Sequence, residues 1–213
     1  MRFSRRTPHG MFEKLILVGL GNPGARYEST RHNMGFLVAD ALARKRGLDW
    51  KRGARSYHRC ECEIASTRVL LIKPQTYMNL SGEAVLELRE SRPFQNRELL
   101  VVVDDIALPL GALRLRTQGS DGGHNGLRSI IEEMETTRFA RLRLGVGPVP
   151  PGLDPADFVL DSFPEDDLDT VRRMVRAAVR CIEFVVTEGY SRAMSRFNTV
   201  PDNTDHADEG TTQ

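Results

Sequence analysis

The segment from Leu15 to Gly35 constrains the fold of this chain most. It begins with four apolar residues, Leu15–Val18, a run too short for an ordinary helix and followed by glycine, so it predicts a buried strand. Three glycines and a proline then allow a sharp turn and a close backbone approach. A polar loop delivers His32 to the start of an apolar helix. A lone histidine there is more often a surface residue, but α/β proteins also bind their ligands at such junctions.

Residues 19–24 fit the G-x-G-x-x-G pattern of dinucleotide-binding proteins, and we reject that interpretation. The fingerprint needs a helix that opens within the glycines, where its N-terminus meets the pyrophosphate. Here the helical spacing of apolar residues begins only near Met34. The acidic residue at about the right distance, Asp40, belongs to that first helix rather than to the end of a second strand.

Composition limits the classes of protein to which this chain can belong. A chain of 213 residues with 40% hydrophobic content suits one domain with a sizeable core. Basic residues crowd positions 44–55 and acidic residues crowd positions 165–169, which permits one basic face, although such runs are more often solvated surface. Three cysteines argue against a disulfide framework, and Cys60-Glu61-Cys62 lacks zinc-site spacing. No apolar run approaches the length of a membrane span.

The expected domain covers residues 11–199. Residues 1–10 are basic and free of acids, and we interpret them as a disordered extension; a very short transit peptide and an upstream start before Met11 are the alternatives. Residues 200–213 are polar and are expected to form a disordered tail.

Strands and helices are expected to alternate through this domain. The pattern predicts strands at about 14–19, 57–65, 68–73, 99–103, 113–116 and 141–146, and helices at about 33–46, 81–91, 126–134, 165–187 and 190–196. The strands at 57–65 and 68–73 read as an antiparallel pair. The fold class is therefore α/β, a single domain with a twisted mixed β-sheet and helices on both faces.

Polar side chains follow several of these strands. Asn22 and His32 come after the first strand, Asn79 after the strand that ends at Lys73, and Asp104 ends the strand at 99–103, while a glycine-rich loop carries His124 and Asn125. If the strands are parallel, these groups meet at one edge of the sheet. An imidazole, a carboxylate and several amides suit acid–base hydrolysis. The sequence has no nucleophile elbow, so a covalent intermediate is not expected. No metal cluster is expected either.

The order and length of these motifs resemble those of the bacterial-type peptidyl-tRNA hydrolases. The resemblance extends over nearly the whole chain, from about Leu15 to Asn198. The matching stretches are VGLGNPG at 18–24, Tyr27 with TRHN at 30–33, KPQTYMNLSG at 73–82, Asp104-Asp105 with LPLG at 108–111, GGHNGL at 122–127 and RLRLGVG at 141–147.

The resemblance implies an enzyme that cleaves the ester between a peptide and the 3′-terminal ribose of tRNA, and so recycles tRNA from stalled or aborted translation. It implies a cytoplasmic monomer that uses neither cofactor nor metal. His32 would activate water, Asp104 would orient His32, and Asn22 would also act in catalysis. The remaining matched positions would bind substrate: Tyr27, Met78, Asn79, His124, Asn125, Arg116 and Arg143.

Two arginine pairs support an RNA substrate. Arg114 and Arg116 alternate on one expected strand, and Arg141 and Arg143 alternate on another, so each pair shares a face. Guanidinium groups bind phosphate bidentately, and the resemblance assigns Arg116 and Arg143 to the 5′-terminal phosphate of tRNA, away from the ester.

The sequence departs from the family pattern at two positions, and two alternative functions remain open. The family commonly has an aspartate where Ala107 stands and a small residue where Asp121 stands, and Asp121 adds negative charge near a site that must accept RNA. The main alternative is a splicing-type RNA-binding factor on the same fold, in which hydrolysis is dispensable; a second is an aminopeptidase or nucleosidase on a related fold. The complete set of His32, Asp104, Asn22 and Asn79 argues against a pure RNA-binding factor, which has no need of an acid–base pair.

Overall fold

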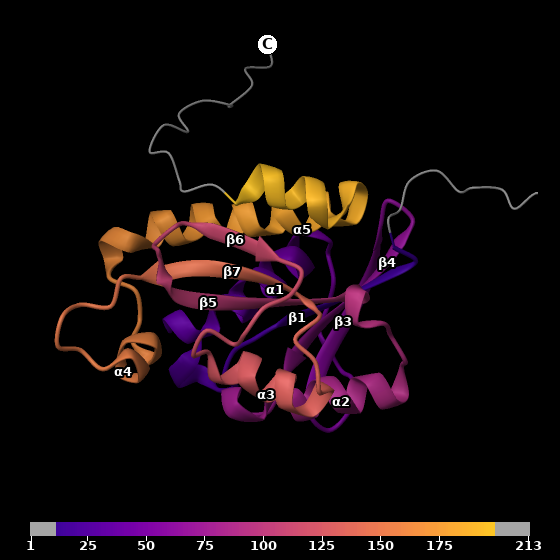
Figure 1. Ribbon diagram of the computed structural model, residues 1–213, viewed down its shortest axis with the longest axis horizontal. Helices are drawn as coiled ribbons and strands as arrows, with labels where there is room; N and C mark the ends of the chain where they lie inside the picture. The colour runs from indigo at the N-terminus through magenta and orange to yellow at the C-terminus, as the bar shows by residue number, and fades with distance from the viewer. Residues whose placement is uncertain (1–11, 199–213) are drawn as a thin grey trace, which may run out of the picture.

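The computed structural model describes residues 12–198, in which one mixed sheet separates two layers of helices (Figure 1). The predictions for residues 1–10 and 200–213 concern residues outside this range. The strands are β1 (Lys14–Gly19), β2 (Lys51–Arg52), β3 (Tyr57–Ile64), β4 (Thr67–Pro74), β5 (Leu99–Pro109), β6 (Leu113–Arg116) and β7 (Ala140–Gly147). The α-helices are α1 (Met34–Lys45), α2 (Ser81–Ser91), α3 (Asn125–Met134), α4 (Pro155–Leu160) and α5 (Leu168–Phe197). Short 3₁₀ turns are η1 (Ala25–Tyr27), η2 (Arg31–Asn33), η3 (Met78–Leu80), η4 (Asn96–Glu98) and η5 (Glu165–Asp167).

The strands lie in the order β2-β3-β4-β1-β5-β7-β6. The central strands β4, β1, β5 and β7 are mutually parallel, while β3 pairs antiparallel with β4, and β6 with β7. The predicted α/β class and mixed sheet are thus confirmed. Because the central strands share one direction, the segments that follow them emerge at the same edge of the sheet.

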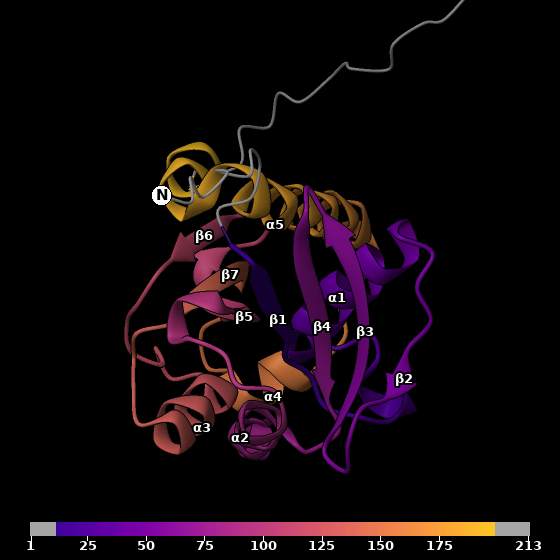
Figure 2. The same ribbon diagram turned by 90° about the vertical axis from the view of Figure 1, so that its right-hand side faces the viewer.

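Alternate side chains of β1 pack into two hydrophobic cores, one on each face of the sheet. Leu15 and Leu17 pack in the core on the side of α1 and α5, whereas Ile16 and Val18 pack in the core on the side of α2 and α3. A strand buried on both faces must be apolar at every position, which is why residues 15–18 form an uninterrupted apolar run. Figure 2 shows the two helical layers on opposite sides of the strands.

Two predicted boundaries are wrong. The strand expected to end at Asp104-Asp105 continues as β5 to Pro109, and it pairs again with β7 at Gly147 after a register shift. The last helix begins at Leu168 rather than Glu165, after η5. The predicted break before Tyr190 is confirmed, since Gly189 has φ 81° and ψ 169° within α5, a conformation that favours glycine.

The sequence patterns also missed two short elements. The two-residue strand β2 extends the sheet beyond β3, and α4 stands between a proline-rich connection and η5 (Figure 1). Among the helices of residues 12–198, none is long and apolar enough to cross a membrane.

Candidate active site

A cavity of about 630 Å³ opens where the segments that follow β1 and β4 and the middle of β5 meet the glycine-rich loop before α3. It gathers nine of the ten predicted site residues; Arg116 does not line it. The lining residues predicted from the sequence are Asn22, Tyr27, His32, Met78, Asn79, Asp104, His124, Asn125 and Arg143.

A close approach of helix and sheet places His32 at the base of this cavity. His32 belongs to η2, which runs directly into α1. A Cβ atom on Gly35 would lie 2.3 Å from the Leu20 nitrogen and from the Val102 oxygen, so only glycine permits this contact. Phe36 also donates its backbone N–H to the Leu20 carbonyl at 3.1 Å. The glycine-rich turn therefore brings a helix start against the strand ends, not a pyrophosphate site.

His32 is paired with Asp104. Its Nδ1 lies 3.0 Å from Asp104 Oδ1 and 3.2 Å from Oδ2, and both residues are buried. An ionised carboxylate only accepts hydrogen bonds, so Nδ1–H of His32 is the donor. In the neutral imidazole the proton is therefore on Nδ1, and His32 Nε2 carries the lone pair. Within residues 12–198, Nε2 has no hydrogen-bond partner, which leaves it able to accept a proton.

His124 is the second donor to Asp104. Its Nδ1 accepts from the backbone N–H groups of Gly126 at 3.1 Å and Leu127 at 3.2 Å, and so caps the N-terminus of α3. Since Nδ1 is an acceptor, the proton is on Nε2, which donates to Asp104 Oδ1 at 3.1 Å. The two imidazole rings lie 4.8 Å apart between centroids. The sequence indicated His124 as a lining residue but not this capping role.

Asp104 carries the charge of this cluster. Burial raises the pKa of its carboxyl, but electrostatic attraction and hydrogen bonds from His124 and His32 outweigh burial and hold the pKa well below its usual range. Asp104 is therefore ionised at neutral pH, as an orienting carboxylate must be.

Asn22 has a fixed amide orientation. Its side-chain Oδ1 accepts the backbone N–H of Met78 at 2.8 Å. The buried Asn33 holds its backbone, with Oδ1 accepting from Asn22 N at 2.8 Å and Nδ2 donating to Asn22 O at 3.0 Å. In the described part of the chain Asn22 Nδ2 has no acceptor, so its two protons are available at the cavity. Asn33 was not among the predicted site residues, although its place beside His32 was the available signal.

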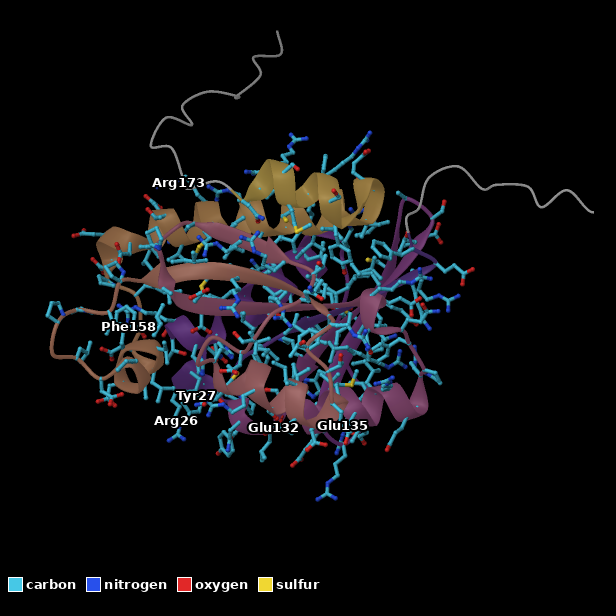
Figure 3. The ribbon with its side chains drawn as sticks, viewed as in Figure 1. Arg26, Tyr27, Glu132, Glu135, Phe158 and Arg173 are labelled. Atoms are coloured by element: carbon cyan, nitrogen blue, oxygen red, sulfur yellow. The ribbon has the colours of Figure 1, made fainter. Side chains whose placement is uncertain are left out.

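The other predicted contacts lie on the cavity wall with different exposure. Asn79 in η3 and Asn125 at the start of α3 are exposed, Tyr27 is half-buried and Met78 is buried. Figure 3 shows Tyr27 at the end of the molecule where α4 and Phe158 lie. Sequence reasoning missed the wall that α4 contributes, formed by Asp154, Pro155, Ala156, Val159 and Leu160, together with Tyr77, Asp105 and Ile106.

The four arginines do not form one open cluster. Cross-strand pairing places Arg114 opposite Arg143 and Arg116 opposite Arg141, so all four start from one face. Arg114 and Arg116 are exposed, but Arg141 is buried. The Arg141 guanidinium donates to the carbonyls of Gly119, Ser120 and Thr137. Burial and the nearby Arg143 lower the pKa of Arg141 to about 10. The expectation that Arg141 helps to form an open phosphate site is therefore wrong.

Arg143 lies closer to the candidate chemistry than expected. It lines the same cavity as His32 and forms an ion pair with Asp105, 3.2 Å from NH1 to Oδ2. Its NH2 donates to the Ser120 carbonyl at 2.9 Å. A phosphate that binds Arg143 must therefore share it with Asp105.

One of the two departures has a local explanation. Asp121 Oδ1 accepts the N–H of Gly123 at 2.7 Å, which closes a turn in the glycine-rich loop, and it lies 3.8 Å from Arg128 NH2. Its charge thus has a structural use and a cationic neighbour. Ala107 donates its backbone N–H to Asp105 Oδ1 at 2.9 Å, which does not depend on its side chain, and nothing in the structure explains the alanine.

His32, Asp104 and His124 are close enough together to be considered as metal ligands, with one candidate ligand atom from each within 4.8 Å of the others. Their hydrogen bonds offer a different use of the same atoms, because both nitrogens that face Asp104 are satisfied as donors. The cysteines lie elsewhere: none lines the cavity, and burial raises the pKa of Cys60 to about 11 and of Cys181 to about 12. These two thiols are protonated at neutral pH and unsuited to nucleophilic attack.

Comparison with known proteins gives a consistent result. A family model described as peptidyl-tRNA hydrolase matches residues 16–206. A peptidyl-tRNA hydrolase of Chloroflexus aggregans is 46% identical over 184 residues, covering 86% of this chain and 98% of the relative. One from Fervidobacterium nodosum is 41% identical over 186 residues, covering 87% and 97%. The crystal structure of peptidyl-tRNA hydrolase from Acinetobacter baumannii superposes with a TM-score of 0.83 at 31% identity, covering 89% of this chain and 97% of that one.

Proposed function

The chain belongs to the peptidyl-tRNA hydrolase family and hydrolyses peptidyl-tRNA, and we propose that His32 is the general base of this reaction. The observation that supports this assignment is the His32–Asp104 pair: Nδ1 is committed to a buried, ionised carboxylate, while Nε2 has no partner among the described residues.

In the proposed first step, His32 Nε2 takes a proton from water as the water oxygen attacks the carbonyl carbon of the ester. The carbonyl oxygen becomes an oxyanion, and Asn22 Nδ2 is the donor best fixed to stabilise it, because Oδ1 is already held by Met78. Asp104 holds the imidazole in the required tautomer and stabilises the imidazolium.

In the second step the tetrahedral intermediate collapses, and its bond to the 3′-oxygen of the ribose breaks. The imidazolium of His32 returns its proton to that oxygen, so the products are tRNA and a free peptide acid. The base is regenerated without a covalent enzyme intermediate.

We assign the two ends of the substrate by chemistry. Apolar side chains of Met78, Val159 and Leu160 suit a peptide of variable sequence. Asn79, Asn125, Tyr27 and His124 are proposed contacts around the ester. Arg143 on the cavity wall and Arg116 on exposed β6 are the proposed contacts to a tRNA phosphate.

The proposal includes a cytoplasmic monomer that acts without cofactor or metal in recycling tRNA from interrupted translation. The alternative of an RNA-binding factor without hydrolysis is not favoured, because the similar proteins are hydrolases by name and the base–carboxylate pair is assembled.

The direct test compares cleavage with binding. The full chain is incubated with peptidyl-tRNA carrying a labelled peptide and, separately, with the same tRNA uncharged. Release of free peptide by catalytic amounts of protein is expected. Binding of both RNAs without release would establish the RNA-binding alternative.

A further inference from the structure

Arg31, the neighbour of His32, has a buried guanidinium group that the reaction scheme does not use. The residue is 8% exposed. Its NH1 donates to the backbone carbonyls of Phe158 and Asp161, each at 3.1 Å. Its guanidinium carbon lies 4.2 Å from the centre of the Phe158 ring and 5.2 Å from that of Phe163. The contact is therefore a clamp on backbone oxygens and aromatic faces, not an ion pair.

The clamp holds an element that cannot stand alone. Helix α4 has six residues, and a helix this short is unstable without tertiary contacts. Among the named elements of residues 12–198, its main packing partner is η2, the turn that contains Arg31 and His32. Phe158 is the buried residue of α4 and its ring lies against the Arg31 guanidinium, while Val159 and Leu160 line the cavity. Figure 3 labels Phe158 on α4.

The contacts that do not involve the Arg31 side chain hold the residues just after α4. Arg31 N donates to Asp161 O at 3.1 Å, Thr30 and Ser162 form an isolated bridge, and the hydroxyls of Ser29 and Ser162 lie 2.8 Å apart. These contacts fix residues 161–162. The Arg31 side chain is what extends the attachment into α4 itself, at Phe158.

We propose that Arg31 is a positioning residue that seats α4 against the His32 turn and so sets the apolar wall of the substrate cavity. Without the side chain, residues 161–162 stay attached through the contacts described above, but α4 is no longer held and the wall can move. His32 keeps its own supports, since Asp104, Gly35 and the Asn33–Asn22 contacts do not involve the Arg31 side chain. The inference rests on the proposed function for what the wall contacts, the acyl part of peptidyl-tRNA.

The primary test is steady-state kinetics of Arg31→Ala and Arg31→Lys on peptidyl-tRNA. We expect KM to rise roughly tenfold in Arg31→Ala with kcat within about twofold and an unchanged pH profile, because a displaced wall weakens binding without touching the base. Arg31→Lys keeps the charge but not the flat guanidinium stacked on the phenylalanines, so its KM should also rise. Arg173→Ala, on the exposed surface of α5 (Figure 3), is the matched control and should leave KM unchanged.

A double-mutant cycle tests the contact itself. Phe158→Leu should raise KM by a similar factor, and combining it with Arg31→Lys should raise KM by less than the product of the two single effects. Multiplicative effects would show that the two residues act separately and would overturn the proposal. An unchanged KM in both arginine variants, or a fall in kcat with an altered pH profile, would also overturn it.

Amide hydrogen exchange supplies a readout that does not depend on activity. Residues 156–160 should exchange faster in Arg31→Lys than in the unaltered protein, while α1 stays equally protected. Unchanged exchange in α4 would contradict the clamp even if the protein proved inactive. Inactivity of the unaltered protein would instead contradict the proposed function.

Discussion

The carboxylate of Asp104 organises the site at the scale of single residues. It accepts hydrogen bonds from two imidazoles. One of them also caps a helix, and the second nitrogen of the other has no partner among residues 12–198. The same residue type therefore has two roles, set by what the Nδ1 atom contacts. His124 is held as a donor, and His32 is held as a base.

Asn22 can be tested by changing its donor and keeping its acceptor. In Asn22→Asp, one carboxylate oxygen can still accept the N–H of Met78, but the other places negative charge where the oxyanion forms. We expect kcat to fall by about 100- to 1,000-fold, with a much smaller change in KM. A kcat near that of the unaltered protein in Asn22→Asp would remove Asn22 from oxyanion stabilisation.

The lowered pKa of Asp104 makes a signed prediction for stability. An unfolded aspartate titrates near pH 3.9, and the folded carboxyl titrates lower, so the ionised form stabilises the fold above about pH 4. That stabilisation is lost as the pH falls through the folded pKa. In urea unfolding between pH 2 and pH 6, the stability difference between the unaltered protein and Asp104→Asn should shrink as the pH falls. A constant difference would contradict the lowered pKa.

At the scale of elements, α3 is tied to the site through its cap. His124→Asn should separate the two functions of this residue, because an asparagine Oδ1 can accept the N–H groups at a helix start but is too short to serve Asp104 as well. We expect a thermal stability between those of the unaltered protein and of His124→Ala, because the bond to Asp104 is lost while the cap is kept, and a loss of activity of about tenfold.

His124→Ala is the matched variant. It loses the cap as well as the hydrogen bond to Asp104, so its free energy of unfolding should be about 1 kcal/mol lower than that of His124→Asn. Equal stability of the asparagine and alanine variants would show that the cap contributes nothing.

The elements that could be predicted from sequence are those whose apolar pattern matches their burial. Residues 81–91 and 113–116 were predicted to the residue, because apolar spacing and turn residues agree there. Helix α4 was missed because it holds six residues after a proline-rich run, and its position depends on Arg31. The end of β5 was misplaced because two aspartates resemble a strand end, whereas Asp104 is buried between two histidines.

At the scale of the whole molecule, the parallel order of the central strands explains why the candidate site residues could be predicted from loops far apart in sequence. The reach of each side chain could not be predicted. Arg141 belonged to a plausible surface pair, but it is buried, and its guanidinium bonds the carbonyls of Gly119 and Ser120. Its carbonyl partners carry no signature in the sequence.

Arg116 and Arg143 are both predicted to contact the tRNA body, but only Arg143 also lines the cavity. Arg116→Ala should weaken cleavage of full peptidyl-tRNA and lower the salt dependence of binding, while a peptide ester on a short CCA end is cleaved as before. Arg143→Ala should share the first effect, but it also frees Asp105 at the cavity wall. Comparable losses on the short substrate in both variants would place the arginines in the fold or the chemistry and would contradict a phosphate contact.

The central claim is that His32 performs the chemistry without being needed for the fold or for tRNA binding. The most direct test is single-turnover cleavage of peptidyl-tRNA by His32→Ala, with binding of the same substrate and the melting temperature measured in parallel. The account predicts that the cleavage rate falls about 100- to 10,000-fold while binding and melting remain close to those of the unaltered protein. Near-normal turnover by His32→Ala would contradict it.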